Sequence, residues 1–267
     1  MEITLIQGLL LALVGFICGC DQTFEVFYWF RPLVVSFFAG IVLGNVELGV
    51  ACGAVGELAY LGLLTVGGTV PPDPLMAGMM TVVIAYTTGQ SPDAAIGLSL
   101  PFALLAQWVG VIFNTVYVSV AHKCDEYAKN ADVAGFNRII PLALFIKAGV
   151  VALMVFLCAF ALQGPIQIFV NSFPEWLIHG FEIAGGMLPA VGLGLLLMVM
   201  LKSRNVAYLF LGFIMATFLD MPNVLPIAIT AAALAYINYK HEKAADDAVA
   251  AVKASAATFD GDDPDGI

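Results

Sequence analysis

Two carboxylates stand within the apolar stretch of residues 49–78. Glu57 lies among small and apolar residues, and Asp73 lies in the run Pro71-Pro72-Asp73-Pro74, which follows Gly67-Gly68 and breaks the helix. A carboxylate near the centre of a bilayer costs about 2.5–3.5 kcal/mol on insertion scales. Broken backbone at this depth survives only where protein buries it or water lines it. The two acids therefore predict a polar cavity inside a membrane protein, where a carboxylate accepts hydrogen bonds from sugar hydroxyls or holds an ion or a proton.

Other polar side chains are candidates for the same cavity. Gln107 and Asn114 are seven residues apart, which is two helical turns, so both amides lie on one face of a helix. An amide both donates and accepts hydrogen bonds, which suits a polyhydroxyl substrate and equally suits contacts between helices. Glu182 lies near the outer end of another apolar segment, as a substrate ligand or an interfacial acid. We predict Glu57, Asp73, Gln107, Asn114 and Glu182 as substrate-binding residues.

Residues for other chemistry do not gather into recognisable motifs. The three histidines belong to no Ser-His-Asp or metal-binding pattern, and the five cysteines show no paired metal spacing. The sequence contains no phosphate-cradling GxxxxGK[ST] motif, so it encodes no ATPase of that class. We therefore predict no catalytic residue, no metal ion and no cofactor, and an integral membrane enzyme is disfavoured.

Composition places these residues in a membrane. The 267 residues are 61% hydrophobic and 11% charged, whereas a soluble domain carries about 25% charged residues. The mean hydropathy is +0.96, and the short alternating strands of an outer-membrane barrel are missing. No basic patch indicates nucleic acid. We predict an all-α, polytopic membrane protein, with residues 1–239 in the membrane and residues 240–267 as an acidic, disordered tail.

The apolar segments differ in length between the two halves of the chain. The first four are short and are interrupted by Arg31-Pro32 and by the break at Asp73. Two re-entrant hairpins, 3–20 with 33–46 and 47–66 with 75–88, and four short crossings are both compatible with this pattern. In the hairpin reading, Arg31 extends from a hairpin tip toward the lipid headgroups. The later predicted helices are 94–121, 139–162 with Lys147 as its one charge, 177–201, 206–219 and 223–239.

Basic residues predict the orientation. They cluster at Lys123, Lys129 and Arg138, at Lys202 and Arg204, and at Lys240 and Lys243. Two hydrophobic segments separate each successive pair of clusters, so all three clusters can lie on the cytoplasmic side. This arrangement places the C-terminal tail in the cytoplasm.

Several blocks of sequence resemble the IIC component of mannose-family sugar phosphotransferase systems. The resemblance covers nearly the whole chain and is specific in the order of the Glu57, Pro-Pro-Asp-Pro and Gly-Gly-Met blocks. The Pro-Pro-Asp-Pro block and the Asp-Gly-Ile ending make the chain most similar to the galactosamine and N-acetylgalactosamine branch. The blocks are MEITLIQGLLLAL, FRP, GIVLGNVELGVACGAVGELAYLGL, VPPDPLMAGMMTVVIAYTTG, IGLSLPFALLAQ, HGFEIAGGMLPAVGLGLLL and the terminal DGI.

This resemblance implies a transport subunit of the bacterial inner membrane that is not an enzyme by itself. It implies a IID membrane partner, a trimer of IIC–IID pairs, and cytoplasmic IIA and IIB proteins whose histidines pass phosphate from phosphoenolpyruvate to the sugar. It also implies the re-entrant hairpins and broken helices around a midplane site. An acid-lined site would repel the phosphorylated product. It would also favour the ammonium of an amino sugar, whereas an N-acetyl sugar does not need it. The alternative is an ion-coupled secondary sugar transporter with Glu57 as a proton site.

Overall fold

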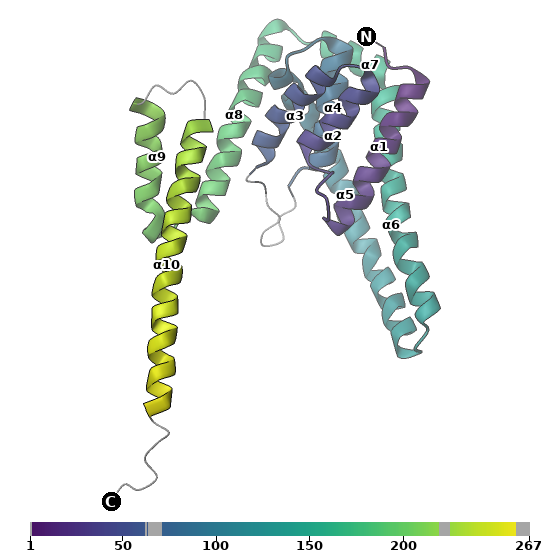
Figure 1. Ribbon diagram of the computed structural model, residues 1–267. Coiled ribbons are helices and arrows are strands. Elements are labelled where there is room, and N and C mark those ends of the chain that lie inside the picture. The colour runs from purple at the N-terminus through teal and green to yellow at the C-terminus, as the bar shows by residue number, and fades with distance from the viewer. Residues whose placement is uncertain (1, 62, 64–70, 219–224, 260–267) are drawn as a thin grey trace, which may run out of the picture. The chain divides into compact units, whose positions relative to one another are not determined.

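The structure, a computed structural model, describes residues 2–61, 63, 71–218 and 225–259 (Figure 1). These residues form helices and contain no strand, which confirms the all-α prediction. Two compact units divide the chain between Met200 and Leu201. The first unit contains α1 (Leu5–Phe24), α2 (Pro32–Leu43), α3 (Val46–Tyr60), α4 (Pro74–Thr88), α5 (Pro92–Lys129), α6 (Val133–Phe156) with the π-helical turn η1 (Leu157–Ala161), α7 (Gln163–Asn171) and α8 (Glu175–Met200). The second contains η2 (Ser203–Asn205), α9 (Val206–Phe218) and α10 (Leu225–Phe259).

Helix length separates candidate membrane crossings from shorter elements. Within the described residues, four helices are long and apolar enough to cross a membrane: α1, α5, α6 with η1, and α8. Helices α2, α3 and α4 have 12, 15 and 15 residues, whereas a crossing needs about 20. Short helices in the N-terminal half are compatible with the re-entrant hairpins, which stay a prediction.

The observed packing partners of α1 and α2 differ from those of the first predicted hairpin, which joined residues 3–20 with residues 33–46. Helix α1 packs chiefly against α6, and α2 packs chiefly against α3, instead of α1 pairing with α2. On α1, Gly8 and Gly15 lie so close to Phe160 and Val155 that an added Cβ would come within 2.7 Å and 2.9 Å of them. Small residues let helix backbones approach closely in a membrane, so the glycines of α1 favour packing against the side chains of α6 and η1.

Two glycines bring α2 and α3 into backbone contact. The chain turns between them at Gly44, whose φ is +73°, and the Asn45 side chain caps α3 by accepting a hydrogen bond from Leu48 N at 3.1 Å. A Cβ on Gly49 would lie 2.6 Å from the Ser36 carbonyl oxygen and 2.8 Å from the Gly40 Cα. This pair of helices therefore needs glycine at its crossing point.

Replacing Gly49 by alanine is expected to lower the melting temperature of the purified protein. The added methyl group must push α2 and α3 apart, which costs about 1–3 kcal/mol for an overpacked contact. Gly149→Ala on α6 is the matched control, because a Cβ at Gly149 meets nothing within 4 Å. That variant should be neutral or slightly more stable, since alanine is the better helix former. Equal melting temperatures for the two variants would contradict the close crossing.

Helix α4 forms the centre of the first unit. Every residue from Leu75 to Ala85 is buried, and α2, α3 and α5 all pack against this helix. Its few polar groups are satisfied inside the protein, because Ser36 Oγ donates to the Gly78 carbonyl at 3.0 Å and Thr81 Oγ1 donates to the Ala77 carbonyl at 2.7 Å. The start of α4, where Asp73 lies, is therefore held by neighbours on several sides.

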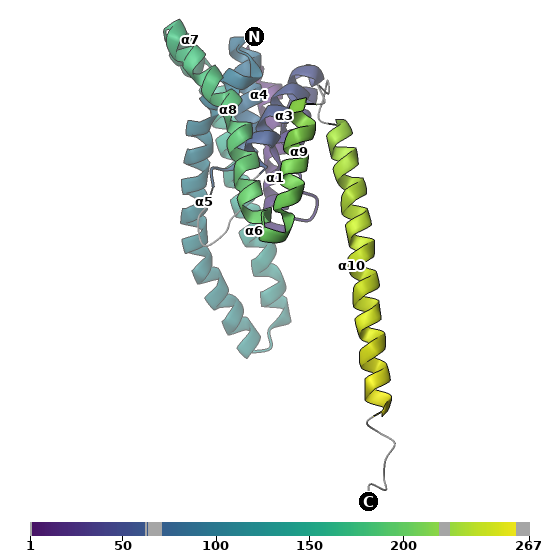
Figure 2. The same cartoon turned by 90° about the vertical axis from the view of Figure 1, so that its left-hand side faces the viewer.

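Helices α5 and α6 run side by side to the turn between Lys129 and Val133 (Figures 1 and 2). The 38 residues of α5 extend over roughly 57 Å at 1.5 Å per residue. This exceeds the roughly 30 Å thickness of the hydrocarbon core. One end of the pair therefore extends beyond the bilayer, and the charged residues from Lys123 to Arg138 lie at the end that carries the turn.

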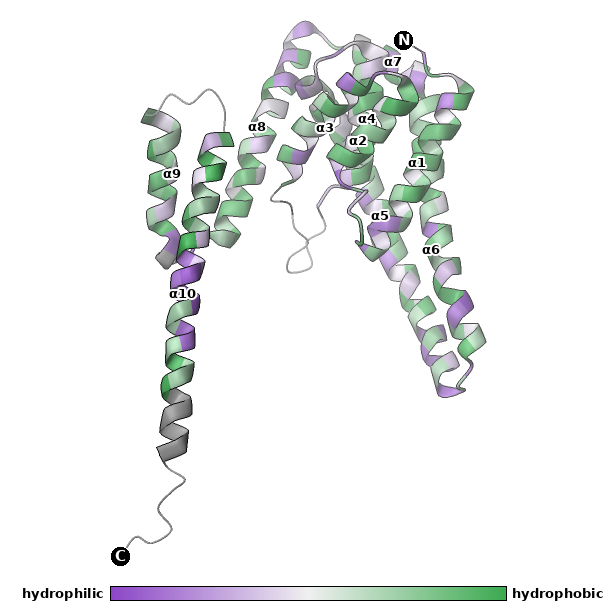
Figure 3. Ribbon diagram, in the orientation of Figure 1, coloured by the Kyte–Doolittle hydropathy of each residue, from purple (hydrophilic) through white to green (hydrophobic). Residues whose placement is uncertain are grey.

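The second unit differs from the predicted tail. Residues 240–259, for which the sequence predicted disorder, continue α10 as helix. Figure 3 shows hydrophobic residues along the first part of α10, then a hydrophilic stretch, and then hydrophobic residues again. Alanine recurs from residue 244 onward, and its high helix propensity accounts for the continued helix. The predicted turn at residues 220–222 and the last residues, 260–267, lie outside the described part. The domain boundary at residue 239 stays a prediction.

Candidate functional site

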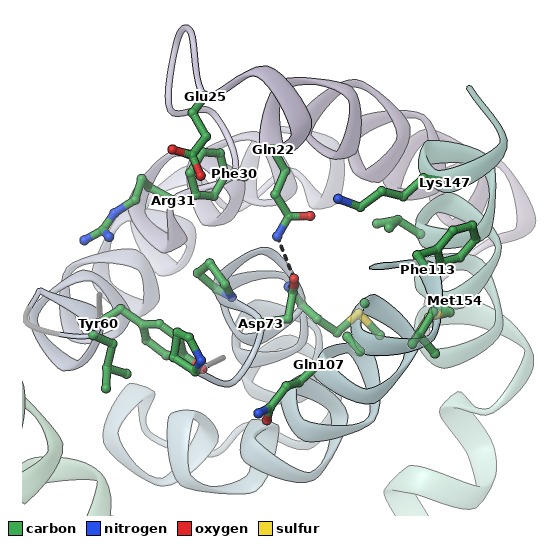
Figure 4. Close-up of a pocket in the computed structure, with 18 of the residues that line it drawn as sticks. Gln22, Glu25, Phe30, Arg31, Tyr60, Asp73, Gln107, Phe113, Lys147 and Met154 are labelled. Atoms are coloured by element: carbon green, nitrogen blue, oxygen red, sulfur yellow. Dashed lines mark hydrogen bonds between the residues drawn. The ribbon is translucent and has the colours of Figure 1, made fainter. Parts of the chain in front are cut away.

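A cavity of about 440 Å³ opens in the first unit beside the start of α4 (Figure 4). Its walls come from the end of α1, the segment that joins α1 to α2, the end of α3, the middle of α5 and the middle of α6. Ligand pockets for small molecules measure about 300–1,000 Å³. The cavity is therefore large enough for a single sugar ring.

Asp73 stands at the middle of this cavity. It is the N-cap of α4, and its Oδ1 accepts a hydrogen bond from Met76 N at 2.8 Å. Its Oδ2 accepts a hydrogen bond from Gln22 Nε2 of α1 at 2.6 Å, drawn in Figure 4. Its backbone N donates to the Ala103 carbonyl of α5 at 3.1 Å. The interrupted helix is thus anchored to α1 and α5, and the carboxylate is held in one orientation.

Glu57 is paired with Arg31 and does not line the cavity. Glu57 Oε1 lies 2.7 Å from Arg31 Nε and 2.5 Å from a terminal guanidinium nitrogen, and each side chain is 22% exposed. Glu57 Oε2 also accepts a hydrogen bond from Leu33 N at 3.3 Å. Arg31 itself lines the cavity. Glu57 therefore holds the Arg31 side chain without lining the cavity itself. The hairpin reading extended Arg31 to the lipid headgroups, whereas the structure pairs it with Glu57. A partly buried charge needs such a partner.

The charges around the cavity balance. The charged lining residues are Glu25 and Asp73 with Arg31 and Lys147, which is two acids and two bases. Figure 4 shows Lys147 pointing from α6 toward Gln22 and Asp73. The expectation of an acid-lined cavity, which would repel a phosphate, does not match this lining. We did not predict Lys147 as a site residue, although it is the one charge in the apolar segment 139–162.

The predicted amides lie on the cavity wall. Gln107 and Asn114 both line it from α5, on one face of the helix as their spacing predicts. Among the predicted substrate-binding residues, Asp73, Gln107 and Asn114 are thus brought together. Their contact with a substrate stays a prediction.

Glu182 lies outside this cavity. On α8, its Oε1 accepts a hydrogen bond from Ser91 Oγ at 3.4 Å, and its Oε2 lies 3.4 Å from His179 Nδ1. Ser91 is the N-cap of α5, so this contact joins α8 to the start of α5. The structure does not bring Glu182 to the other candidates, and its substrate-binding role stays a prediction.

Further polar side chains line the cavity that the sequence analysis did not predict as substrate-binding: Gln22, Glu25, Tyr28, Arg31, Tyr60 and Lys147. For the residues at helix ends and in the segment between α1 and α2, the signal in the sequence is weak, because polar residues at such positions usually face solvent or headgroups. For Lys147 the available signal was its position as the one charge of an apolar segment. In the part of the chain that the structure describes, no three His, Cys, Asp or Glu side chains gather as they would around a metal ion.

Comparison with known proteins identifies relatives over almost the whole chain. The family described as "PTS system sorbose-specific IIC component" matches residues 5–237, where PTS stands for phosphotransferase system. N-acetylgalactosamine permease IIC component 1 of Escherichia coli strain K12 is 44% identical over 242 residues, which are 91% of each chain.

Two solved structures are similar at 29% identity, and each match covers 90% of this chain and 97% of the other. One is described as the structure of a membrane protein, with a TM-score of 0.82, and the other is the mannose transporter ManYZ in complex with microcin E492, with a TM-score of 0.59. The family match and the 44% identity confirm the resemblance seen in the sequence blocks, and the chain belongs to the family of IIC components, the membrane permease subunits of sugar phosphotransferase systems.

Proposed function

We propose that this chain binds N-acetylgalactosamine in the cavity beside Asp73 and carries it across the membrane while partner subunits phosphorylate it. The observation that carries the proposal is the lining itself: a fixed carboxylate, two amides on one face of α5 and balanced charges surround a space of about 440 Å³. Amides and carboxylates are the groups that pair with sugar hydroxyls. The 44% identity to an N-acetylgalactosamine permease component supports the choice of sugar.

Charge balance favours the N-acetyl sugar over galactosamine. Galactosamine carries an ammonium group near neutral pH, and a cation is stabilised by a net negative site. The lining of the cavity instead contains two acids, Glu25 and Asp73, and two bases, Arg31 and Lys147. A neutral acetamido sugar adds no charge to this balance.

The proposed partners follow from the family. We propose a IID membrane subunit, cytoplasmic IIA and IIB phosphocarrier proteins, and a trimer of IIC–IID pairs in the bacterial inner membrane. The 29% identity to a chain of the ManYZ structure supports work within a complex. The C-terminus is proposed to lie in the cytoplasm, on the side of Lys202, Lys240 and the charged turn between α5 and α6.

Uptake into right-side-out membrane vesicles tests the proposed coupling. Vesicles that contain the complete complex are loaded with the cytoplasmic phosphocarrier proteins, with or without phosphoenolpyruvate. We expect N-acetylgalactosamine to accumulate as its phosphate ester only when phosphoenolpyruvate is present. Accumulation of unmodified sugar driven by a proton or sodium gradient would overturn this coupling in favour of an ion-coupled secondary transporter.

Replacing Lys147 by glutamine is expected to shift the sugar preference toward galactosamine. The lining then carries one more acid than base, which stabilises the ammonium but hardly affects a neutral acetamido group. We expect the ratio of the two affinities to change by about tenfold in favour of galactosamine. Isothermal titration of the purified complex with both sugars measures this ratio. Lys123→Gln is the control, because Lys123 is an exposed lysine of α5 paired with Glu126. An unchanged ratio in Lys147→Gln would contradict the charge argument.

A further inference from the structure

The Tyr60 hydroxyl is a buried polar group without a partner. Tyr60 is the last residue of α3, and its exposed fraction is 3%. Of the buried side-chain nitrogen and oxygen atoms in the described ranges, its hydroxyl oxygen alone has no hydrogen-bond partner. Buried polar groups are nearly always hydrogen-bonded, so an exception requires an explanation.

Packing alone does not explain a tyrosine at this position. The side chain belongs to an apolar cluster with Ala59, Ala77 and Ala103, against which Leu63 and Leu188 pack. A phenylalanine ring would fill the same space without burying a hydroxyl. The hydroxyl therefore costs free energy in the protein by itself and must gain a partner that the protein does not supply.

The cavity is where such a partner can come from. Tyr60 lines the cavity together with Asp73 and Gln107. In Figure 4, Tyr60 and Lys147 lie on opposite sides of Asp73, so the sugar site would be bounded by the hydroxyl on one side and the lysine on the other. A tyrosine hydroxyl donates one hydrogen bond and accepts others, which matches the oxygen atoms of a sugar.

We propose that Tyr60 is a substrate-binding residue whose hydroxyl donates a hydrogen bond to an oxygen of the transported sugar. This inference rests on the proposed function of the cavity as the sugar site. It assigns the orphaned hydroxyl to the sugar-bound state, in which its hydrogen bond is made. The ring holds its place through the apolar cluster, so the hydroxyl is preorganised for binding.

The test compares Tyr60→Phe with the wild-type complex of this chain and its partner subunits. Titration with N-acetylgalactosamine, galactosamine, galactose and mannose first identifies which sugars the wild type binds. For the sugar that binds best, we expect Tyr60→Phe to weaken the affinity by about 2- to 12-fold, the value of one neutral hydrogen bond. Melting curves without sugar should show Tyr60→Phe to be as stable as the wild type or more stable, because no protein hydrogen bond is lost.

Tyr117→Phe is the matched control. The Tyr117 hydroxyl of α5 donates to the Ala143 carbonyl at 2.8 Å, and Tyr117 does not line the cavity. Removing that hydroxyl should lower the melting temperature and leave the sugar affinity unchanged. The two substitutions are thus expected to have different effects: Tyr60→Phe should weaken sugar binding, and Tyr117→Phe should lower stability.

The outcomes distinguish this inference from the function on which it rests. If the wild type binds a sugar and Tyr60→Phe binds it equally well, the role of the hydroxyl is wrong while the sugar site stands. If Tyr60→Phe lowers the sugar-free melting temperature as Tyr117→Phe does, the hydroxyl is structural and the inference also fails. If the wild-type complex binds none of the four sugars, the proposed function fails, and the role of Tyr60 fails with it.

Discussion

Asp73→Asn is expected to reduce sugar transport by about 10- to 150-fold while the protein remains folded. The substitution removes a charge and little else. Asparagine is as good an N-cap as aspartate, so the bond from Met76 N at 2.8 Å can be kept. Gln22 can rotate its amide to donate or accept, so the contact with α1 is also retained. A hydrogen bond to a charged group contributes about 1.5–3 kcal/mol, which converts to this loss if the carboxylate binds sugar hydroxyls.

A second variant separates binding from capping at the same residue. Asp73→Ala removes the charge and also the cap of α4, which costs about 1 kcal/mol of stability in addition. We expect both variants to lose transport, but only Asp73→Ala to melt at a lower temperature. Uptake of radiolabelled sugar and thermal melting of the purified complex measure the two effects.

Asp132→Asn is the control for the same chemical change. Asp132 is the exposed N-cap of α6 and accepts a hydrogen bond from Gly135 N at 2.9 Å. It lies away from the cavity lining, so transport should remain at the wild-type rate. If the Asp73→Asn variant also transports sugar at the wild-type rate, Asp73 only caps α4 and does not bind the sugar.

Glu57→Gln is expected to destabilise the protein strongly through Arg31. The substitution leaves the guanidinium without its carboxylate at a site where each side chain is only 22% exposed. Breaking a fully buried pair costs about 3–5 kcal/mol, and partial exposure lowers our expectation to about 1–3 kcal/mol. Arg31 lines the cavity and loses the carboxylate that holds its side chain in place, so transport should fall together with stability.

A double-mutant cycle isolates the pair. We expect Arg31→Gln with Glu57→Gln to be more stable than either single variant predicts, because no unpaired charge remains. The coupling free energy should be about 1–3 kcal/mol. The exposed pair of Lys123 and Glu126, 2.8 Å apart with side chains 60% and 59% exposed, is the matched cycle. Its expected coupling is at most about 0.5 kcal/mol. Additive effects at Arg31 and Glu57 would mean that the pair contributes nothing to the fold.

Much of the fold could be predicted from the order of the residues. Long apolar runs with few charges determine that the chain is helical and lies in a membrane, because backbone polar groups in lipid must be satisfied within each segment. The Pro-Pro-Asp-Pro run determines that a helix begins anew at α4 with an acidic cap, since proline lacks the N–H and aspartate supplies the capping oxygen. The spacing of Gln107 and Asn114 determines that they share a face of α5.

The partners of these residues depended on tertiary structure. Arg31 and Glu57 are 26 residues apart, and Gln22 and Asp73 are 51 residues apart, so each contact exists only because separate helices pack in one arrangement. The sequence placed Glu57 in a cavity and Arg31 at the headgroups, whereas packing pairs them. Lys147 and Tyr60 reach the cavity because α6 and α3 present those faces to it.

By itself, then, the amino-acid sequence determined a helical membrane protein of the IIC family, with an acid at a helix break and amides on one helix face. Tertiary structure alone decided that Glu57 pairs with Arg31 outside the cavity lining, that Glu182 lies away from the cavity, and that the lining contains equal numbers of acids and bases. The physical reason is that residue type and periodicity fix what a helix offers on each face. Which face meets which neighbour is settled by close contacts, such as the glycine crossing of α2 and α3, between segments far apart in the chain.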